Sequence, residues 1–318
     1  MNIEHLTRNY GSLTAVNRVN FDLKRGEVLG FLGPNGAGKS TTMQMITGNL
    51  APSEGKITIN GIDLLDNPKL AKAEIGYLPE QPPLYYELTV EEYLHFCAKI
   101  NGIQRPRQNN AVNYAINRCG LGDVKKRLIT NLSKGYQQRV GIAQAIIHTP
   151  SIVILDEPTV GLDPIQIREI RKLIRELGNE HSVILSTHIL PEVQMTCDRV
   201  QIINKGQLVF SDSIDSLNQS MQATSLIAQF ENCPSADQLE AIENVESVES
   251  LSENKVRIQF NNSPAKRIAI EAVSNNWGLL ELTPEQKSLE QIFVEITSSE
   301  NLPGNPADNE KTTTEDAA

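Results

Sequence analysis

Hydrophobic residues follow two different periods along the first 210 residues of the chain. Apolar runs of strand length, at Val28–Leu32, Ile152–Leu155 and Val183–Ser186, predict buried strands. Apolar residues at helical spacing predict a helix over Ile165–Leu177. Because strands and helices alternate in this order, we expect a mostly parallel α/β sheet with covering helices.

The first 80 residues are expected to contain strands and turns with one helix. This helix is predicted over Lys39–Thr47 and ends at Gly48, since glycine suits the left-handed residue that closes many helices. Alternation over Lys56–Asn60 predicts a half-buried strand, and Val200–Asn204 with Gln207–Phe210 predicts a closing hairpin.

Residues 89–145 are predicted to be mainly helical. Thr89 and Glu92 form a capping box, in which each side chain accepts a backbone N–H at the start of a helix. The apolar face of this helix is expected to consist of Val90, Tyr93, Leu94, Cys97 and Ile100. Eight basic residues against one Asp lie between Asn101 and Arg139, and we interpret them as a solvated helical face rather than a phosphate track.

The composition changes near residues 211–222, and the following pattern predicts a β-α-β-β-α-β order with one further helix. The predicted elements are strand 224–231, helix 235–243, strand 246–252, strand 255–261, helix 264–275, strand 277–283 and helix 287–297. That order suggests a small ferredoxin-like α+β unit. Residues 298–318, with five acids and one Lys, are predicted to form a disordered tail.

Composition and charge exclude several classes of protein. Of the 318 residues, 39% are hydrophobic and 21% charged, which is typical of a globular protein. The net charge of −10 argues against a nucleic-acid binder that relies on bulk positive charge. Residues 1–210 sum to +3 and residues 211–318 to −13, so the acidity belongs to the last third.

Targeting signals and cysteine usage indicate a cytosolic chain. No apolar run reaches the ~18 residues needed to span a bilayer, and Met1–His5 does not begin a signal peptide. The four cysteines form no CxxC pair and have no His cluster beside them, so we interpret them as buried free thiols. They are Cys97, Cys119, Cys197 and Cys233.

The segment Gly33–Ser40 fits the phosphate-loop pattern G-x-x-x-x-G-K-[ST] between a predicted strand and a helix. Its glycines let backbone N–H groups surround phosphate oxygens, and the helix N-terminus adds partial positive charge. Lys39 can reach the β- and γ-phosphates, and the Ser40 hydroxyl can bind Mg²⁺. The residues expected to hold the nucleotide here are Gly33, Pro34, Asn35, Gly36, Ala37, Gly38, Lys39, Ser40 and Thr41.

Two carboxylates follow the predicted strand Ile152–Leu155, at the strand end where parallel sheets bind ligands. Asp156 can hold Mg²⁺. Glu157 points elsewhere and could accept a proton from an attacking water. An acidic pair after a strand is usually only the start of a turn or helix, but the phosphate loop favours the functional interpretation.

Ser133 and Gly135 place a hydroxyl and bare backbone at the start of a helix predicted through Ile147, which makes a second anion site. Five motifs then stand in a specific order and spacing: Gly33–Ser40, Leu132–Arg139, Leu155–Pro158, Gly161–Asp163 and Ser186–His188. On these motifs, residues 1–215 resemble the nucleotide-binding subunits of ATP-binding-cassette (ABC) transporters.

The resemblance implies an α/β fold of the P-loop NTPase class. Residues 1–215 would form the ABC ATP-binding domain, with a helical subdomain at about 82–145. Residues 222–297 would form the small α+β, ferredoxin-like accessory domain and 298–318 the acidic tail. The implied ligands are ATP and Mg²⁺, with Ser40, Asp156 and Glu80 as metal ligands.

By the same resemblance, Tyr10 stacks on adenine, and Ser133 and Gly135 of a second copy cap the γ-phosphate bound by Lys39. Asp163 would lie across that homodimer interface, and His188 would contact the γ-phosphate and the attacking water. Glu157, His188 and Lys39 would be the catalytic residues. Three alternatives stay open: Tyr10 as an edge aromatic, His188 as a core histidine, and Asp163 as a helix N-cap before Pro164.

Two departures from the family pattern refine the prediction. Leu132–Tyr136 reads Leu-Ser-Lys-Gly-Tyr where the family more often has Leu-Ser-Gly-Gly-Gln. Glu80 stands where most members carry a Gln that binds Mg²⁺, and Gln81 is the alternative ligand. Both variants, together with Ser288–Phe293, resemble the branch of bacterial exporters whose membrane partner is a separate ABC-2-type polypeptide.

The sequence therefore predicts an ATPase subunit that dimerises around two ATP molecules and drives a separate integral membrane permease. It would lie peripherally on the cytoplasmic face of the inner membrane, with no nucleic-acid partner. The docking surface is expected within residues 82–125, including Pro82–Tyr86, with an ordinary loop as the alternative. Two other functions stay open: a soluble ATP-driven clamp and a regulator that binds ATP without hydrolysing it.

Overall fold

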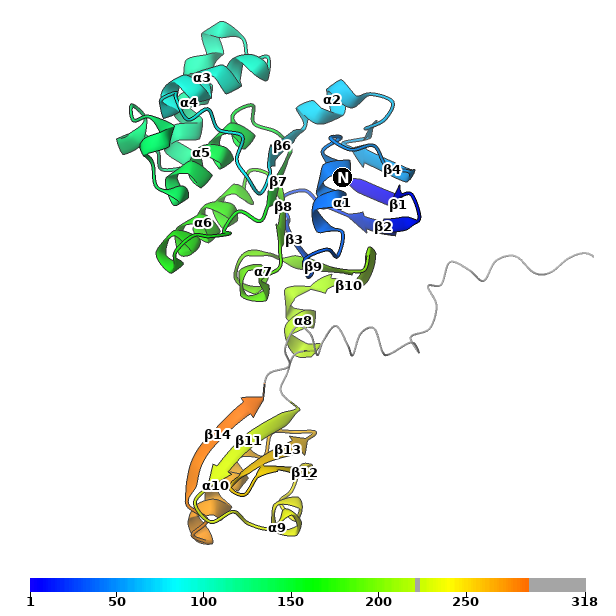
Figure 1. Cartoon of the computed structure of the whole chain (residues 1–318), viewed down its shortest axis with the longest axis vertical. Helices are drawn as coiled ribbons and strands as arrows, with labels where there is room; N and C mark the ends of the chain where they lie inside the picture. The colour runs from blue at the N-terminus through cyan, green and yellow to red at the C-terminus, as the bar shows by residue number, and fades with distance from the viewer. Residues whose placement is uncertain (221–223, 286–318) are drawn as a thin grey trace, which may run out of the picture. The chain divides into compact units, whose positions relative to one another are not determined.

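The structure is a computed structural model that describes residues 1–220 and 224–285 (Figure 1). The chain divides into two compact units, Met1–Leu217 and Asn218–Ala318. Each unit has a hydrophobic core of its own.

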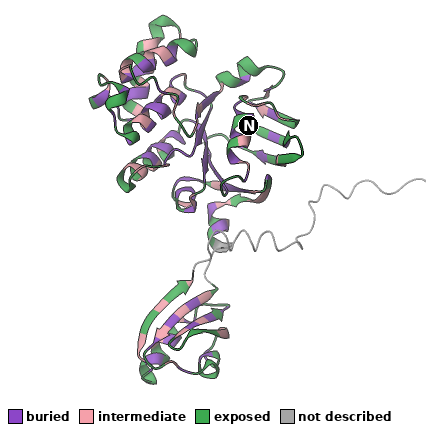
Figure 2. Ribbon diagram, viewed as in Figure 1, coloured by how far each residue is buried: buried purple, intermediate pink, exposed green. Residues whose placement is uncertain are grey.

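A six-stranded sheet forms the centre of the first unit, in the order β10-β9-β3-β8-β7-β6. The strands are β3 (Val28–Leu32), β6 (Ile75–Leu78), β7 (Ile152–Asp156), β8 (Ser182–Thr187), β9 (Arg199–Asn204) and β10 (Gln207–Ser213). All neighbours are parallel except β10 with β9, which form the predicted hairpin. Because β3, β7 and β8 are buried on both faces, their sequences are apolar except at the strand ends, where Asp156, Ser182, Ser186 and Thr187 stand (Figure 2).

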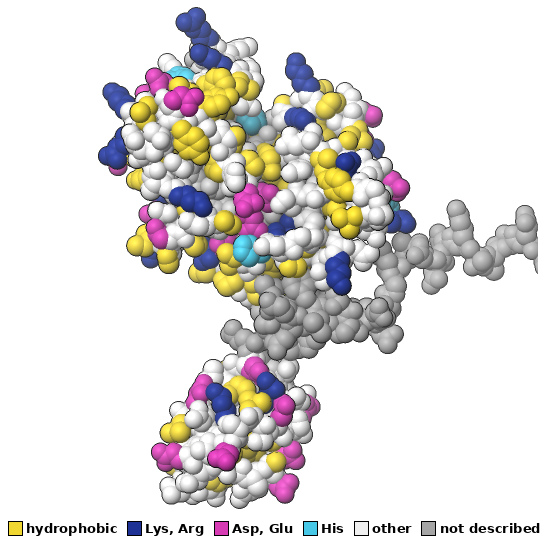
Figure 3. Space-filling view, in the orientation of Figure 1, with side chains coloured by type: hydrophobic (Ala, Val, Ile, Leu, Met, Phe, Trp, Pro, Cys, Tyr) yellow, Lys and Arg dark blue, Asp and Glu magenta, His cyan; other side chains and the backbone are white. Residues whose placement is uncertain are grey.

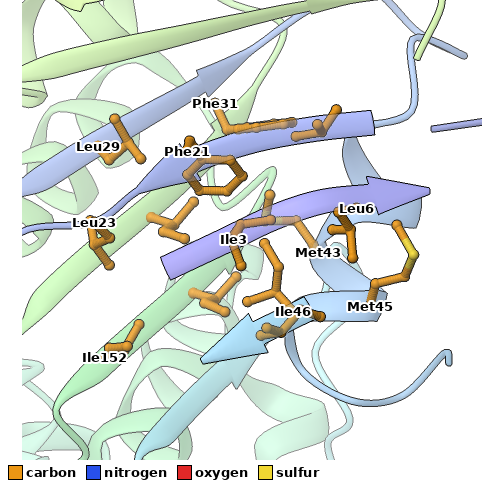
Figure 4. Close-up of a cluster of buried hydrophobic side chains, with 14 of the residues drawn as sticks. Ile3, Leu6, Phe21, Leu23, Leu29, Phe31, Met43, Met45, Ile46 and Ile152 are labelled. Carbon is orange, nitrogen blue, oxygen red and sulfur yellow. The ribbon is translucent and has the colours of Figure 1, made fainter. Parts of the chain in front are cut away.

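A second, antiparallel sheet covers one side of the first helix, in the order β2-β1-β4-β5. Its strands are β1 (Asn2–Tyr10), β2 (Leu13–Asp22), β4 (Glu54–Ile59) and β5 (Ile62–Asp63). Helix α1 (Lys39–Ile46) contributes Met43 and Ile46 to a core that also contains Leu6 of β1 and Ile152 of β7 (Figure 4). Apolar burial on both sides of α1 therefore fixes the loop that precedes it.

Further helices follow along the first 220 residues. They are α2 (Pro68–Ala73), α3 (Val90–Ile100), α4 (Arg105–Arg118), α5 (Lys134–Ile146), α6 (Pro164–Leu177), α7 (Leu190–Thr196) and α8 (Ile214–Ser220), with short 3₁₀ turns at Gly122–Val124 and Ile129–Asn131. Of these, α5, α6 and α7 pack on the six-stranded sheet, while α3 and α4 pack on each other and on α5 (Figure 1). The predicted capping box at Thr89 and Glu92 is confirmed. Within the described part of the chain, no helix is long and apolar enough to cross a membrane.

Two predictions about these helices were wrong. Helix α2 was missed, because it has six residues and buries only Ala71, which is too little for a helical period. Ile100 is 68% exposed, because the buried face of α3 continues through Ala98 instead. None of the basic residues between 101 and 139 is buried, and two of them pair with partly exposed glutamates, Arg118 with Glu180 and Arg139 with Glu169 of α6.

The second unit has the strand and helix order that the sequence predicted over residues 224–283. Its elements are β11 (Ser225–Phe230), α9 (Ala236–Glu240), β12 (Val245–Ser252), β13 (Lys255–Phe260), α10 (Ala265–Ser274) and β14 (Leu279–Glu285). The antiparallel order β12-β13-β11-β14 is the ferredoxin-like arrangement. Phe230 packs edge-on against Trp277 in its core. The predicted helix 287–297 and tail 298–318 lie outside the described residues.

Candidate functional site

The phosphate loop joins β3 to α1 and wraps around the buried ammonium group of Lys39. Nζ of Lys39 donates to the carbonyl oxygens of Gly33 at 2.8 Å and Pro34 at 3.3 Å. Gly38 has φ +107°, and a Cβ there would lie 2.6 Å from the carbonyl oxygen of Ala15. Only glycine can therefore close the loop so tightly onto β2.

Two adjacent carboxylates follow β7, and their backbone turns them in different directions. Glu157 has φ +49°, a left-handed conformation that costs a non-glycine residue about 1 kcal/mol or more. Its Oε1 lies 3.4 Å from Nζ of Lys39. Asp156 is only 3% exposed, and its Oδ1 has no hydrogen-bond partner. The strained turn thus brings Glu157 to the lysine while Asp156 stays under the loop.

Burial is the main reason that the pKa of Asp156 lies above its usual value. The nearby hydroxyls of Ser186 and Ser40 oppose this rise, and the charges of Glu157 and Glu80 add to it. The carboxylate of Asp156 is therefore held in a place where, without a cation, its charge is disfavoured.

His188 follows β8 directly and faces Glu157 across the two neighbouring strand ends. Its Nδ1 lies 3.0 Å from Oε2 of Glu157. Because an ionised carboxylate only accepts hydrogen bonds, Nδ1 of His188 is the donor in this contact. The imidazole is half-exposed, so it lies at the mouth of the site rather than in the core.

These groups meet in an open cleft of about 310 Å³. It is lined by Ala15, Asn35, Gly36, Gly38, Lys39, Ser40, Thr41, Glu80, Glu157, Val160 and His188. On the face seen in Figure 3, acidic side chains gather in the middle of the first unit close to a histidine. Sequence reasoning missed Ala15, which contributes through its backbone and has no side-chain signal, and Val160, which lies between two recognised motifs.

Eight predicted residues are not among those that line the cleft of their own chain. Four of them, Gly33, Pro34, Ala37 and Asp156, belong to the two motifs beside it, and the other four are Tyr10, Ser133, Gly135 and Asp163. Tyr10, at the end of β1, is 45% exposed, and the guanidinium of Arg8 lies 4.7 Å from its ring centre. Ser133 is the N-cap residue of α5 without a side-chain cap bond, and Gly135 follows inside the helix. Asp163 caps α6 and accepts the N–H groups of residues 165 and 166. Of the two candidate metal ligands, Glu80 lines the cleft and Gln81 is not among the lining residues.

A phosphate loop between a parallel strand and a helix, with a buried Asp at a nearby strand end, defines a P-loop nucleoside triphosphatase. Residues 16–160 match the family described as "ABC transporter". The chain is 35% identical over 293 residues to the "Bacitracin transport ATP-binding protein BcrA" of Bacillus licheniformis, which covers 92% of this chain and 95% of that protein. The chain therefore belongs to the ATP-binding proteins of ABC transporters, and it is an ATPase.

Solved structures agree with this assignment over the cassette. The cbiO1 protein from Clostridium perfringens, described as part of the ABC transporter complex cbiONQ, is 31% identical, with a TM-score of 0.64 over 69% of this chain and 90% of that chain. A dimeric structure of MJ0796, described as a bacterial ABC transporter cassette, is 25% identical, with a TM-score of 0.61 over 67% of this chain and 98% of that chain. The resemblance predicted from the sequence is confirmed, and dimerisation is a property of this family.

Proposed function

We propose that this chain powers a separate ABC-2-type permease, on which it docks at the cytoplasmic face of the membrane. The similarity to BcrA, whose name states bacitracin transport, extends over nearly the whole length of both chains. Glu80 and the Leu132–Tyr136 segment depart from the common ABC pattern in the way that resembles this exporter branch. The cargo would be chosen by the permease.

The meeting of Lys39, Glu157 and His188 in one open cleft carries the proposal of ATP hydrolysis at this site. Glu157 would accept a proton from the attacking water. Lys39 would exchange its contacts with the Gly33 and Pro34 carbonyls and with Glu157 for phosphate oxygens, where its charge stabilises the transition state. Nε2 of His188 would face the γ-phosphate and donate a hydrogen bond to it.

The donor set fits Mg²⁺. Mg²⁺ usually takes one or two carboxylates and completes its shell with phosphate oxygens and water. Asp156 offers a buried Oδ1 without a hydrogen-bond partner, and Ser40 and Glu80 line the cleft. The described residues contain no group of three or more His, Cys, Asp or Glu that could hold a metal by itself, which suits a metal that arrives with the nucleotide. Mg²⁺ would neutralise charge on the phosphates.

A homodimer would complete the site. Ser133, Gly135 and Asp163 lie outside the cleft of their own chain, while the Ser133 hydroxyl makes no cap bond to its helix. In a second copy facing the first, Ser133 and Gly135 would offer a hydroxyl and helix N–H groups to the γ-phosphate. Asp163 would lie at the same interface.

Glu157→Gln tests the proposal directly. We expect this variant to bind ATP normally, to lose at least about 100-fold in kcat because the base is gone, and to accumulate as a dimer with Mg²⁺ and ATP. Size-exclusion chromatography with light scattering measures the dimer, and Lys39→Ala, which should bind ATP poorly, is the control. If Glu157→Gln stays monomeric with saturating ATP, the ATP-sandwich dimer is wrong.

The permease can then be sought with the trapped dimer. Residues 82–125 are the proposed docking surface, and they include Tyr85 and Tyr86, both about half-exposed. Recovery of the Glu157→Gln dimer from membranes, followed by identification of the associated protein, should yield an integral membrane polypeptide. Recovery with ribosomes or DNA instead would contradict the transporter assignment of the partner.

A further inference from the structure

Glu192, on helix α7, is a buried carboxylate that lies behind the cleft and does not line it. Only 1% of it is exposed. Its Oε1 accepts a hydrogen bond from the hydroxyl of Thr159 at 2.6 Å, and its Oε2 accepts one from the hydroxyl of Thr187 at 2.9 Å. Nη2 of Arg171 lies 3.7 Å from Oε1. A buried charge needs such partners, and here all of them come from other elements.

The two threonines are placed beside the two proposed catalytic side chains. Thr159 lies two residues after Glu157, and Thr187 lies immediately before His188. The Thr187 hydroxyl also accepts the backbone N–H of Ile189 at 3.1 Å. The backbone on both sides of His188 is therefore held by the group that Glu192 binds.

The contacts form a closed ring around the ends of β7 and β8. On the cleft side, Nδ1 of His188 contacts Glu157. Between the strands, the backbone N–H of Glu157 donates to the carbonyl of Ser186 at 2.9 Å. On the buried side, Glu192 joins Thr159 to Thr187. Because contacts join the turns of Glu157 and His188 on both the cleft side and the buried side, these turns have fewer alternative conformations than a single contact would leave them.

We propose that Glu192 is a positioning residue for ATP hydrolysis, which holds the turns of Glu157 and His188 in register so that Nδ1 of His188 faces the Glu157 carboxylate. This inference rests on the proposed catalytic roles of those two residues. Through Arg171 the same carboxylate contacts α6, the helix that Asp163 caps. The helix end at Asp163, which would lie at the proposed dimer interface, is thereby connected through Arg171 and Glu192 to the turns of Glu157 and His188.

Three substitutions that keep the shape of the side chain weaken the contacts on the buried side of the ring in the full-length chain. They are Thr159→Val, Thr187→Val and Glu192→Gln. Thr196→Val is the matched control, because Thr196 is also buried on α7 and its hydroxyl has no hydrogen-bond partner. We expect kcat for ATP to fall by about 10- to 100-fold in the three variants, the range of a hydrogen bond to a charged group. KM and the Kd for ATP should change by less than about twofold, because the phosphate loop is untouched.

A double-mutant cycle with His188→Ala separates positioning from a general structural role. If Glu192 acts through His188, Glu192→Gln should lower kcat by less than about twofold when His188 is already removed. Two outcomes would overturn this inference and leave the proposed hydrolysis chemistry intact. One is that Glu192→Gln lowers kcat as much with His188→Ala as without it. The other is that all three ring variants keep wild-type kcat while Glu157→Gln and His188→Ala are impaired. Wild-type kcat in Glu157→Gln and His188→Ala would overturn the proposed hydrolysis chemistry, and this inference with it.

Discussion

At the scale of single residues, the site holds Asp156 and Glu157 in an environment or a backbone conformation that is unfavourable for the protein without a ligand. Asp156 is buried at the end of β7, and its Oδ1 has no donor. Burial raises the pKa of this carboxyl, which means that the folded state disfavours its ionised form. The neighbouring Glu157 occupies a left-handed conformation that is costly for its residue type. Both features are typical of residues kept for function rather than stability.

Asp156→Asn should therefore stabilise the protein without nucleotide while it removes activity. Because the folded-state pKa is raised, the ionised carboxyl subtracts from stability as the pH rises through the usual Asp pKa towards the folded value. At pH 7 we expect the free energy of unfolding to increase by about 1 kcal/mol, and Mg²⁺-dependent ATPase to fall by at least about 100-fold. Urea unfolding at pH 7 and pH 3 measures the gain, which should vanish at the lower pH.

Asp63→Asn is the control of opposite sign. The pKa of Asp63 is lowered by the backbone N–H groups of residues 66 and 65, so its ionised form stabilises the fold above the usual Asp pKa, and this contribution is lost as the pH falls. This variant should be less stable than wild type at pH 7. A loss of stability in Asp156→Asn at pH 7 would contradict the interpretation of its burial.

At the scale of elements, local sequence decides those elements whose signals are contiguous. Helix α3 begins where the capping box places it, with the Thr89 hydroxyl accepting the N–H of Glu92 and the Glu92 carboxylate accepting the N–H of Thr89. Helix α2 has no capping box, only Asn67 before Pro68 at its start, and its residues pack against β5 and β6. The ion pair of Arg118 could not be predicted from local sequence either, because its partner Glu180 lies 62 residues away along the chain.

Thr89→Ala should lower the free energy of unfolding of the first unit by about 1 kcal/mol, because the N–H of Glu92 loses its acceptor. Thermal and urea unfolding followed by circular dichroism measure this loss. The N-cap residue of α4 is Gln104, which is exposed and makes no side-chain cap bond, so Gln104→Ala should be nearly neutral. Equal effects of the two substitutions would show that the capping box contributes nothing to stability.

At the scale of the whole molecule, the chain contains two units with separate cores and different charges. When Asp212 and Asp215 are counted with the first unit, the +3 of residues 1–210 becomes +1 for residues 1–217, and −11 remains for residues 218–318. The ATP chemistry lies in the nearly neutral unit, where polyphosphate meets little repulsion. The net negative charge of the chain belongs to residues 218–318.

The cysteines offer a test of the two units. Cys97, Cys119 and Cys197 are buried in the first unit, and burial raises the pKa of the Cys119 thiol to about 12, which keeps it protonated and unreactive. Cys233 in the second unit is partly exposed. At pH 8 we expect one thiol per chain to react quickly with a thiol reagent.

Mg²⁺ and ATP should then slow the reaction of the three buried thiols by up to about 100-fold at a ligand concentration of 100 Kd, since ligand binding stabilises the first unit. Cys233→Ser, which should remove the fast phase, is the control. Fast reaction of all four thiols in the native protein would contradict the burial of the first-unit cysteines.

The sequence by itself determined the phosphate loop, the acidic pair, the capping box and the family, because each is written in contiguous residues whose chemistry needs a fixed spacing. The resemblance implied that Lys39, Glu157 and His188 meet at one site. Only the tertiary structure decided how, because it places β8 between β3 and β7 and so brings the three side chains to one cleft. It also decided that Oδ1 of Asp156 lacks a donor and that Glu192 closes a ring behind the site. The physical reason is the same in each case: strand order and burial arise from packing between segments far apart in the chain, and no local pattern records it.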